Sequence, residues 1–137
     1  GEVSTQALQS IDTILDQHLN DPALRRRWFL SYISGTKNQA SLGESDPDFS
    51  EDELNELIAR NAALSQNEGS RFVYCLDVAP LMAVDGEAYP FAPNMLPAVQ
   101  FICEHSSFDI AEIPALNDNK AIFELLLRLI RQGSLYS

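Results

Sequence analysis

Few residues of this chain are of the types that carry catalytic or metal chemistry, and their spacing does not suit it. The two histidines are His18 and His105. An iron centre built from two histidines and one carboxylate usually takes two ligands from a His-x-Asp/Glu pair, and neither histidine stands in such a pair. Phosphate-binding loops, dinucleotide-binding glycine patterns, zinc-ligand spacings and serine-nucleophile motifs are also missing. We therefore expect no catalytic, cofactor-binding or metal-binding residue on this chain, and surface or helix-end positions for both histidines.

Cys75 and Cys103 are the only cysteines, and each lies in an apolar stretch. Free cysteine behaves as a small hydrophobic residue, and two cysteines without regular spacing do not form a disulfide framework. No apolar run reaches the ~18–20 residues of a membrane-spanning helix, and no basic stretch precedes an apolar one as in a signal peptide. The sequence therefore predicts reduced thiols, no membrane partner and a cytoplasmic protein.

The charge of the chain restricts its partners. Its 137 residues carry 20 acidic and 9 basic side chains, for a net charge of −11. Seven acids and no base fall in residues 44–56, and residues 62–118 hold eight acids with Arg71 as their only base. Proteins bind nucleic acids largely through Lys and Arg side chains that neutralise phosphates, so we expect no nucleic-acid partner. An acidic surface either keeps a protein soluble or steers it towards a basic partner.

The most strand-like stretch is residues 71–91, which is rich in β-branched, aromatic and aliphatic side chains. Asp85-Gly86 is typical of a type I′ hairpin turn, because both central residues of that turn need a positive φ. We therefore expect a hairpin of residues 81–84 and 87–91, preceded by strands at 62–65 and 71–76. Turn chemistry, rather than a functional site, is the expected role of Asp85.

Two helices are expected at the N-terminus. Apolar residues at three- and four-residue spacing predict the first over residues 4–19, and Asp21-Pro22 is typical of the start of a second, which ends near Gly35. Trp28 and Phe29 offer more apolar surface than two short helices can bury. We expect a helix–helix interface with a second copy of the chain, formed by Ile11, Leu15, Trp28 and Tyr32, with burial in the chain's own core as the alternative.

Helices dominate the rest of the chain. Ser50 and Glu53 form a capping-box pattern before a helix that ends near Arg60, after a polar connection at 36–49. Further helices are expected at 95–104 and 120–132, with a short helix or turn at 109–116 and a closing strand at Leu135-Tyr136. This order predicts an α+β fold with a helical dimerisation segment and acidic linker at 1–60, and a winged-helix-like domain with a small antiparallel β-element at 61–137. The last helix has too few cationic or amide side chains at its start to read DNA bases.

Three stretches of the sequence resemble the C-terminal region of one protein family. They are GSRFVY at 69–74, MAVDGEAY at 82–89 and IFELLLRLIRQGSLY at 122–136. A fourth stretch, YISGTK at 32–37, resembles the middle region of the same family. The family is that of the cupin, or JmjC-type, ribosomal-protein oxygenases, and the resemblance spans nearly the whole chain.

The resemblance implies that the chain corresponds to one part of a larger enzyme. Members of the family have an N-terminal β-helix domain that binds Fe(II) and 2-oxoglutarate, followed by a helical dimerisation segment and a winged helix. They hydroxylate an Arg or His side chain of a ribosomal protein. This chain resembles the last two parts and lacks the iron ligands. The resemblance therefore implies Fe(II) and 2-oxoglutarate only for a preceding cupin domain.

Three functions remain open from the sequence. The first is a non-catalytic dimerisation and winged-helix region of such an oxygenase, forming a homodimer and helping to dock a basic ribosomal protein. The second is a free-standing acidic winged-helix adaptor that binds other proteins. The third, a transcriptional regulator, is disfavoured by the negative charge.

Overall fold

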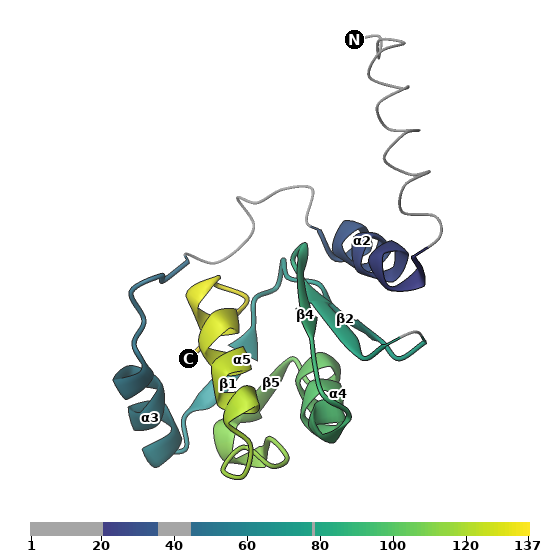
Figure 1. Cartoon of the computed structure of the whole chain (residues 1–137). Helices are drawn as coiled ribbons and strands as arrows, with labels where there is room; N and C mark the ends of the chain where they lie inside the picture. The colour runs from purple at the N-terminus through teal and green to yellow at the C-terminus, as the bar shows by residue number, and fades with distance from the viewer. Residues whose placement is uncertain (1–20, 36–44, 78) are drawn as a thin grey trace, which may run out of the picture.

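A computed structural model of the chain describes residues 21–35, 45–77 and 79–137. The helix expected at 4–19, and with it Ile11, Leu15 and His18, lies outside the described residues, as does most of the connection at 36–49. The described part holds four α-helices and two three-stranded antiparallel sheets. The expected α+β, winged-helix-like arrangement is confirmed (Figure 1).

The first sheet joins strands that are distant in the sequence. Its order is β5-β1-β6, with β1 (Ala63–Gln66) in the centre, β5 (Ser107–Asp109) on one side and β6 (Leu135–Tyr136) on the other. In this sheet Leu64 pairs with Phe108 and Gln66 with Leu135. The strands expected at 62–65 and 135–136 are confirmed, each within a residue. Strand β5 was not expected, because three residues are too few to show an alternating pattern.

The second sheet is built on the expected hairpin. Its strands, in the order β2-β3-β4, are Phe72–Cys75, Leu81–Val84 and Glu87–Pro90. Asp85 and Gly86 have φ of 52° and 88°, the positive values that a type I′ turn requires. All four residues of β3 are buried, because both faces of this sheet are covered. Met82 and Val84 belong to the main core, whereas Leu81 and Ala83 belong to a smaller cluster beneath α2 (Pro22–Ser34).

The remaining helices begin and end close to the expected residues. They are α3 (Glu51–Ala59), α4 (Leu96–Glu104) and α5 (Lys120–Arg131), with short 3-10 helices η2 (Pro93–Met95) and η3 (Ile110–Glu112) before α4 and after β5. Ser50 caps α3, where its Oγ accepts from the Glu53 amide at 3.1 Å. Asn119 caps α5, and Gly133 follows the helix with φ of 84°, a value that favours glycine.

Helix α5 lies in the middle of the molecule, between α3 and the second sheet (Figure 1). Leu126 and Leu129 on α5 are fully buried, and so is Leu54 on α3. These side chains belong to the same core as the inner face of the second sheet. Helix α3 is therefore packed into the same core as residues 61–137.

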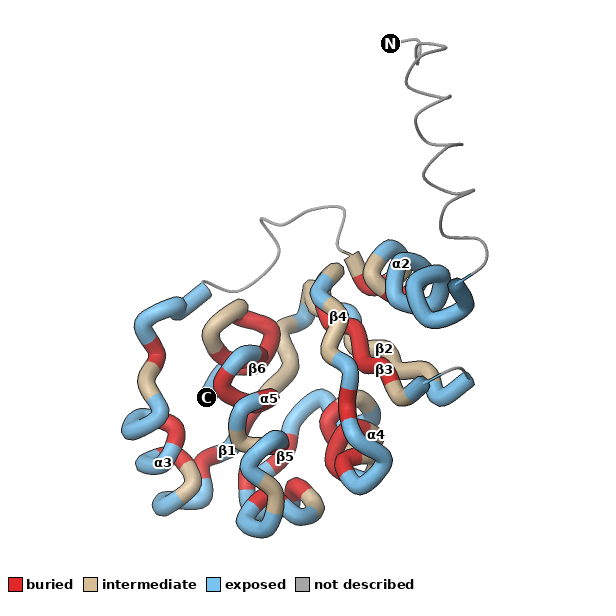
Figure 2. Tube along the Cα trace, in the orientation of Figure 1, coloured by how far each residue is buried: buried red, intermediate tan, exposed pale blue. Residues whose placement is uncertain are grey.

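Helix α2 lies on the opposite face of the second sheet. Asp21 caps it by accepting from the amides of Ala23 and Leu24. Gly35 ends it as expected, but with an extended backbone (φ −63°, ψ 136°) rather than the left-handed one that glycine often adopts there. Most of α2 is exposed, and its buried part faces the sheet (Figure 2).

Candidate interaction surface

The outer side of α2 exposes four large apolar side chains, which we call the aromatic face. They are Leu24, Trp28, Phe29 and Tyr32, with exposed fractions of 43%, 61%, 47% and 72%. Trp28 and Tyr32 lie one helical turn apart, so their rings stack with centroids 5.7 Å apart and an interplanar angle of 12°. Soluble proteins seldom leave neighbouring large apolar side chains exposed unless they form a binding surface.

The inner side of α2 is already occupied by the protein's own sheet. Leu30 is 5% exposed and packs with Leu81 and Ala83 of β3. Arg26 forms an ion pair with Asp77 beside β2. Because α2 buries one side and exposes apolar side chains on the other, the aromatic face cannot turn inwards without losing the Leu30 contacts.

A hydrogen bond also holds the end of α2 to the hairpin turn. The Gly86 amide donates to the Ser34 Oγ at 3.1 Å, and Ser34 is fully buried. A side chain at Gly86 would point at the backbone of Gly35, 3.7 Å from the Cβ position. That distance is an ordinary van der Waals contact, so the positive φ of the turn, rather than a lack of space, favours glycine at 86.

The carboxylate of Asp85 is the centre of a polar network beneath this turn. It accepts from the Ser70 Oγ at 2.7 Å, the Arg71 amide at 2.9 Å and the Ser134 Oγ at 2.5 Å. Gln132 continues the network, since its Nε2 donates to the Ser134 Oγ at 2.7 Å and its Oε1 accepts from the Tyr89 hydroxyl. The network ties the hairpin to the end of α5 and the start of β6.

From the sequence, Asp85 was expected to serve turn chemistry alone, so this second role was not predicted. The turn is present, and the same side chain also joins three separate segments. A signal for this was available. The stretches at 69–74, 82–89 and 122–136, quoted above for the family resemblance, are the ones that meet at the network.

The hydroxyl of Tyr89, at one end of the network, has a raised pKa. Burial, followed by the negative charge of Glu87, raises the pKa of its hydroxyl to about 12. A raised pKa means that the folded state keeps a proton that the unfolded chain loses above about pH 10, so this tyrosine contributes less stability as the pH rises from about 10 to 12.

An absorbance titration of tyrosine at 295 nm tests this value. We expect a component with an apparent pKa of about 12, and we expect Tyr89→Phe to remove it. Tyr136→Phe, which changes an exposed tyrosine, serves as the control and should leave that component in place. Loss of the late component in Tyr136→Phe instead would show that it belongs to another tyrosine.

His105 and the two cysteines are described residues for which no chemical role was expected. His105 is exposed at the end of α4 and stacks on Phe101, with ring centroids 4.1 Å apart. Cys75 and Cys103 are free, half-buried thiols, and burial raises the pKa of the Cys103 thiol to about 12. Cys103 is therefore a neutral thiol near pH 7, consistent with its expected role as a small apolar residue.

Of the expected dimer residues, the structure describes Trp28 and Tyr32 and brings them together on the aromatic face. In residues 21–35, 45–77 and 79–137, no group of three His, Cys, Asp or Glu side chains is placed to hold a metal ion. None of the helices in these ranges is long and apolar enough to cross a membrane.

Comparisons with known proteins found a matching family model and solved structures with the same fold. A family model described as ROXA-like winged helix matches residues 17–136. No curated protein matches the chain. Solved structures of Escherichia coli YcfD, described as a ribosomal oxygenase, share the fold with a TM-score of 0.72 and 17% identity. The similarity covers 99% of this chain and 35–36% of those chains. Two further structures, with the same scores, contain that protein with cobalt and succinic acid and with cobalt and 2-oxoglutarate.

Proposed function

This chain belongs to the ROXA-like winged-helix family, and on that basis we propose that it is the non-catalytic dimerisation and winged-helix region of a JmjC-type, Fe(II)- and 2-oxoglutarate-dependent ribosomal-protein hydroxylase. The chain spans about a third of the YcfD chains that share its fold. In this proposal the iron and 2-oxoglutarate belong to a cupin domain elsewhere in the parent protein. The proposed location of the parent protein is the cytoplasm, where ribosomal proteins are made.

The observation that carries the dimerisation role is the aromatic face of α2. Trp28 and Tyr32 are 61% and 72% exposed although α2 is docked through Leu30 on its other side. A symmetric interface pairs the same patch of both copies, so the aromatic face of one copy would pack against that of the other.

The free energies of burial and association indicate how many side chains this interface must cover. Full burial of one exposed large apolar side chain contributes ~1.5–3 kcal/mol. Trp28 and Tyr32 are 61% and 72% exposed, so covering the rest of both side chains in both copies would contribute ~4–8 kcal/mol. Association costs on the order of 4–15 kcal/mol in lost freedom of motion. The two aromatic residues can therefore form the centre of a dimer interface, but Leu24 and Phe29 must be covered as well for it to be stable.

Sedimentation equilibrium of the chain with Trp28→Glu tests the proposed dimer. We expect a wild-type dimer and a folded monomeric variant, because a carboxylate at the centre of an apolar interface is left unpaired. We expect a dissociation constant at least about 100-fold higher, which corresponds to about 2.7 kcal/mol.

The control is Arg27→Gln, which changes the net charge by the same amount. Arg27 is exposed and lies about 100° from Trp28 around the helix, so this variant should remain a dimer. A wild-type monomer would rule out the dimerisation role and favour the second candidate, a free-standing acidic adaptor.

A further inference from the structure

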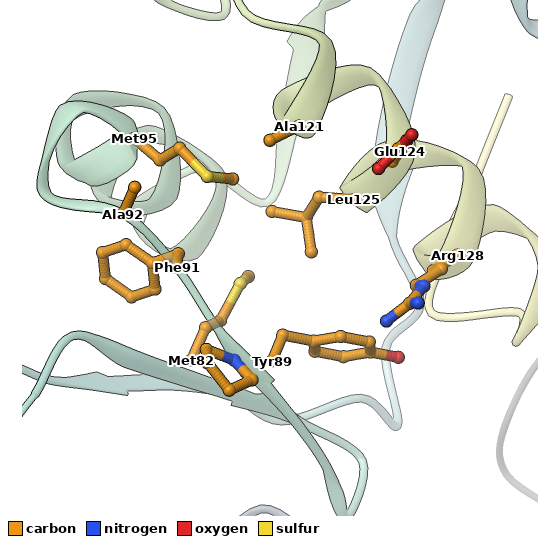
Figure 3. Close-up of a pocket in the computed structure, with 10 residues that line it drawn as sticks. Met82, Tyr89, Phe91, Ala92, Met95, Ala121, Glu124, Leu125 and Arg128 are labelled. Carbon is orange, nitrogen blue, oxygen red and sulfur yellow. The ribbon is translucent and has the colours of Figure 1, made fainter.

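A groove lies between the second sheet and α5 (Figure 3). No residue of the aromatic face lines it. The volume of the groove is about 300 Å³. Its floor is apolar and consists of Met82, Phe91, Met95 and Leu125. Tyr89, Glu124 and Arg128 line its polar side, and the Arg128 side chain extends towards Tyr89 (Figure 3).

Small residues keep the groove open. Ala92 and Ala121 line it from the segment before η2 and from the first turn of α5, and any larger side chain at either place would reduce its volume. Strand β4 is paired on one side only, with β3. Pro90 at its end has no amide hydrogen to offer an added strand, so we expect a ligand to be bound through its side chains rather than as a further strand.

One acidic side chain, Glu124, and one basic side chain, Arg128, line the groove, and Lys120 precedes Glu124 by one turn on the exposed side of α5. Glu124 lies in the middle of the exposed side of α5, and it makes no ion pair or hydrogen bond with another described residue. The negative charges of Glu87 and Asp85 also act on the Tyr89 hydroxyl, against the positive charge of Arg128. With a net charge of −11, the chain as a whole attracts cations and repels phosphates.

We propose that this groove docks an extended segment of a basic protein, with an apolar side chain of that segment on Phe91, Met95 and Leu125 and a Lys or Arg side chain against Glu124. Arg128 can only donate hydrogen bonds, so its role is to bind main-chain carbonyl oxygens of the segment. The proposal gives a location to the basic ribosomal protein expected from the sequence as a partner, and it rests on the proposed role of the chain as part of a ribosomal-protein hydroxylase. It does not depend on the dimer, because the groove and the aromatic face share no residue.

The chain offers a direct probe of the groove. Its only two methionines, Met82 and Met95, both line it, so a protein labelled with ¹³C at the methionine methyl groups gives two NMR signals that report on its occupation. The ligand is a short synthetic peptide in which Leu and Phe alternate with Arg and Lys. A second peptide with Ser in place of Leu and Phe keeps the charge and removes the apolar side chains.

We expect both methionine signals to shift saturably with the first peptide and to remain in place with the second. Glu124→Lys should raise the dissociation constant about fivefold, since one exposed charge pair contributes up to about 1 kcal/mol. Glu56→Lys, an equal charge change on the exposed side of α3, should leave it within about twofold. Ala121→Phe, which fills the groove from an exposed helical position, should abolish the shifts.

Four results would overturn the proposal. They are unmoved signals with the first peptide, equal weakening by Glu56→Lys and Glu124→Lys, shifts caused instead by a single-stranded RNA oligonucleotide, and shifts that follow protein concentration alone because a second copy fills the groove. The titration with the first peptide is repeated with the monomeric Trp28→Glu variant. Binding of the peptide by that variant would separate the groove from the dimer, and a wild-type monomer that still binds the peptide would remove the dimer proposal only.

Discussion

Asp85→Ala should lower the free energy of unfolding by about 3 kcal/mol, although the residue lies in a hairpin turn. Hydrogen bonds to a charged group contribute about 1.5–3 kcal/mol, and this carboxylate accepts from Ser70, Arg71 and Ser134. The left-handed φ of 52° adds about 1 kcal/mol of strain for alanine. Part of this loss is recovered when water replaces the carboxylate. Urea unfolding followed by circular dichroism measures the change.

Asp85→Asn is the matched variant. Asparagine tolerates the left-handed backbone and keeps one acceptor oxygen for the two serine hydroxyls, so we expect a loss of about 1 kcal/mol. Equal and small losses in both variants would show that Asp85 contributes only its backbone conformation to the turn.

Leu126→Ala should have an effect of the same order or larger, about 2–5 kcal/mol. Leu126 is fully buried in α5, the helix between α3 and the second sheet, and truncating a buried leucine loses its transfer free energy and leaves a cavity. For a domain of this size, thermal unfolding should begin roughly 10 °C lower.

The control for this variant is Leu76→Ala. Leu76 is 47% exposed at the end of β2, so its truncation should change the free energy of unfolding by less than about 0.5 kcal/mol. If the two variants were equally stable, α5 could not be the central core helix.

Elements with local signals could be predicted from the sequence. The Asp85-Gly86 turn, the caps Asp21, Ser50 and Asn119, and the stripe of α5 depend on residues within one or two turns of each other. The placement of Trp28 and Tyr32 on the same side of one helix also follows from their spacing in the sequence. Their role as a dimer interface stays a prediction.

Contacts between distant segments could not be predicted. Strand β5 depends on pairing with β1, in which Ala63 lies opposite Asp109, and the polar network joins Asp85 to Ser134 across 49 residues. The groove is likewise formed from β3, β4, η2 and α5 together. Short strands carry too little periodicity to reveal such contacts.

The sequence by itself determined the helices, the hairpin, the negative charge and the family resemblance, because each is encoded by neighbouring residues or by composition. Only the tertiary structure decided which surfaces remain free. Helix α2 buries Leu30 and leaves Trp28 and Tyr32 outside because the second sheet covers one side of it. A face becomes available for binding only when the rest of the chain has packed elsewhere, and that depends on contacts between distant segments.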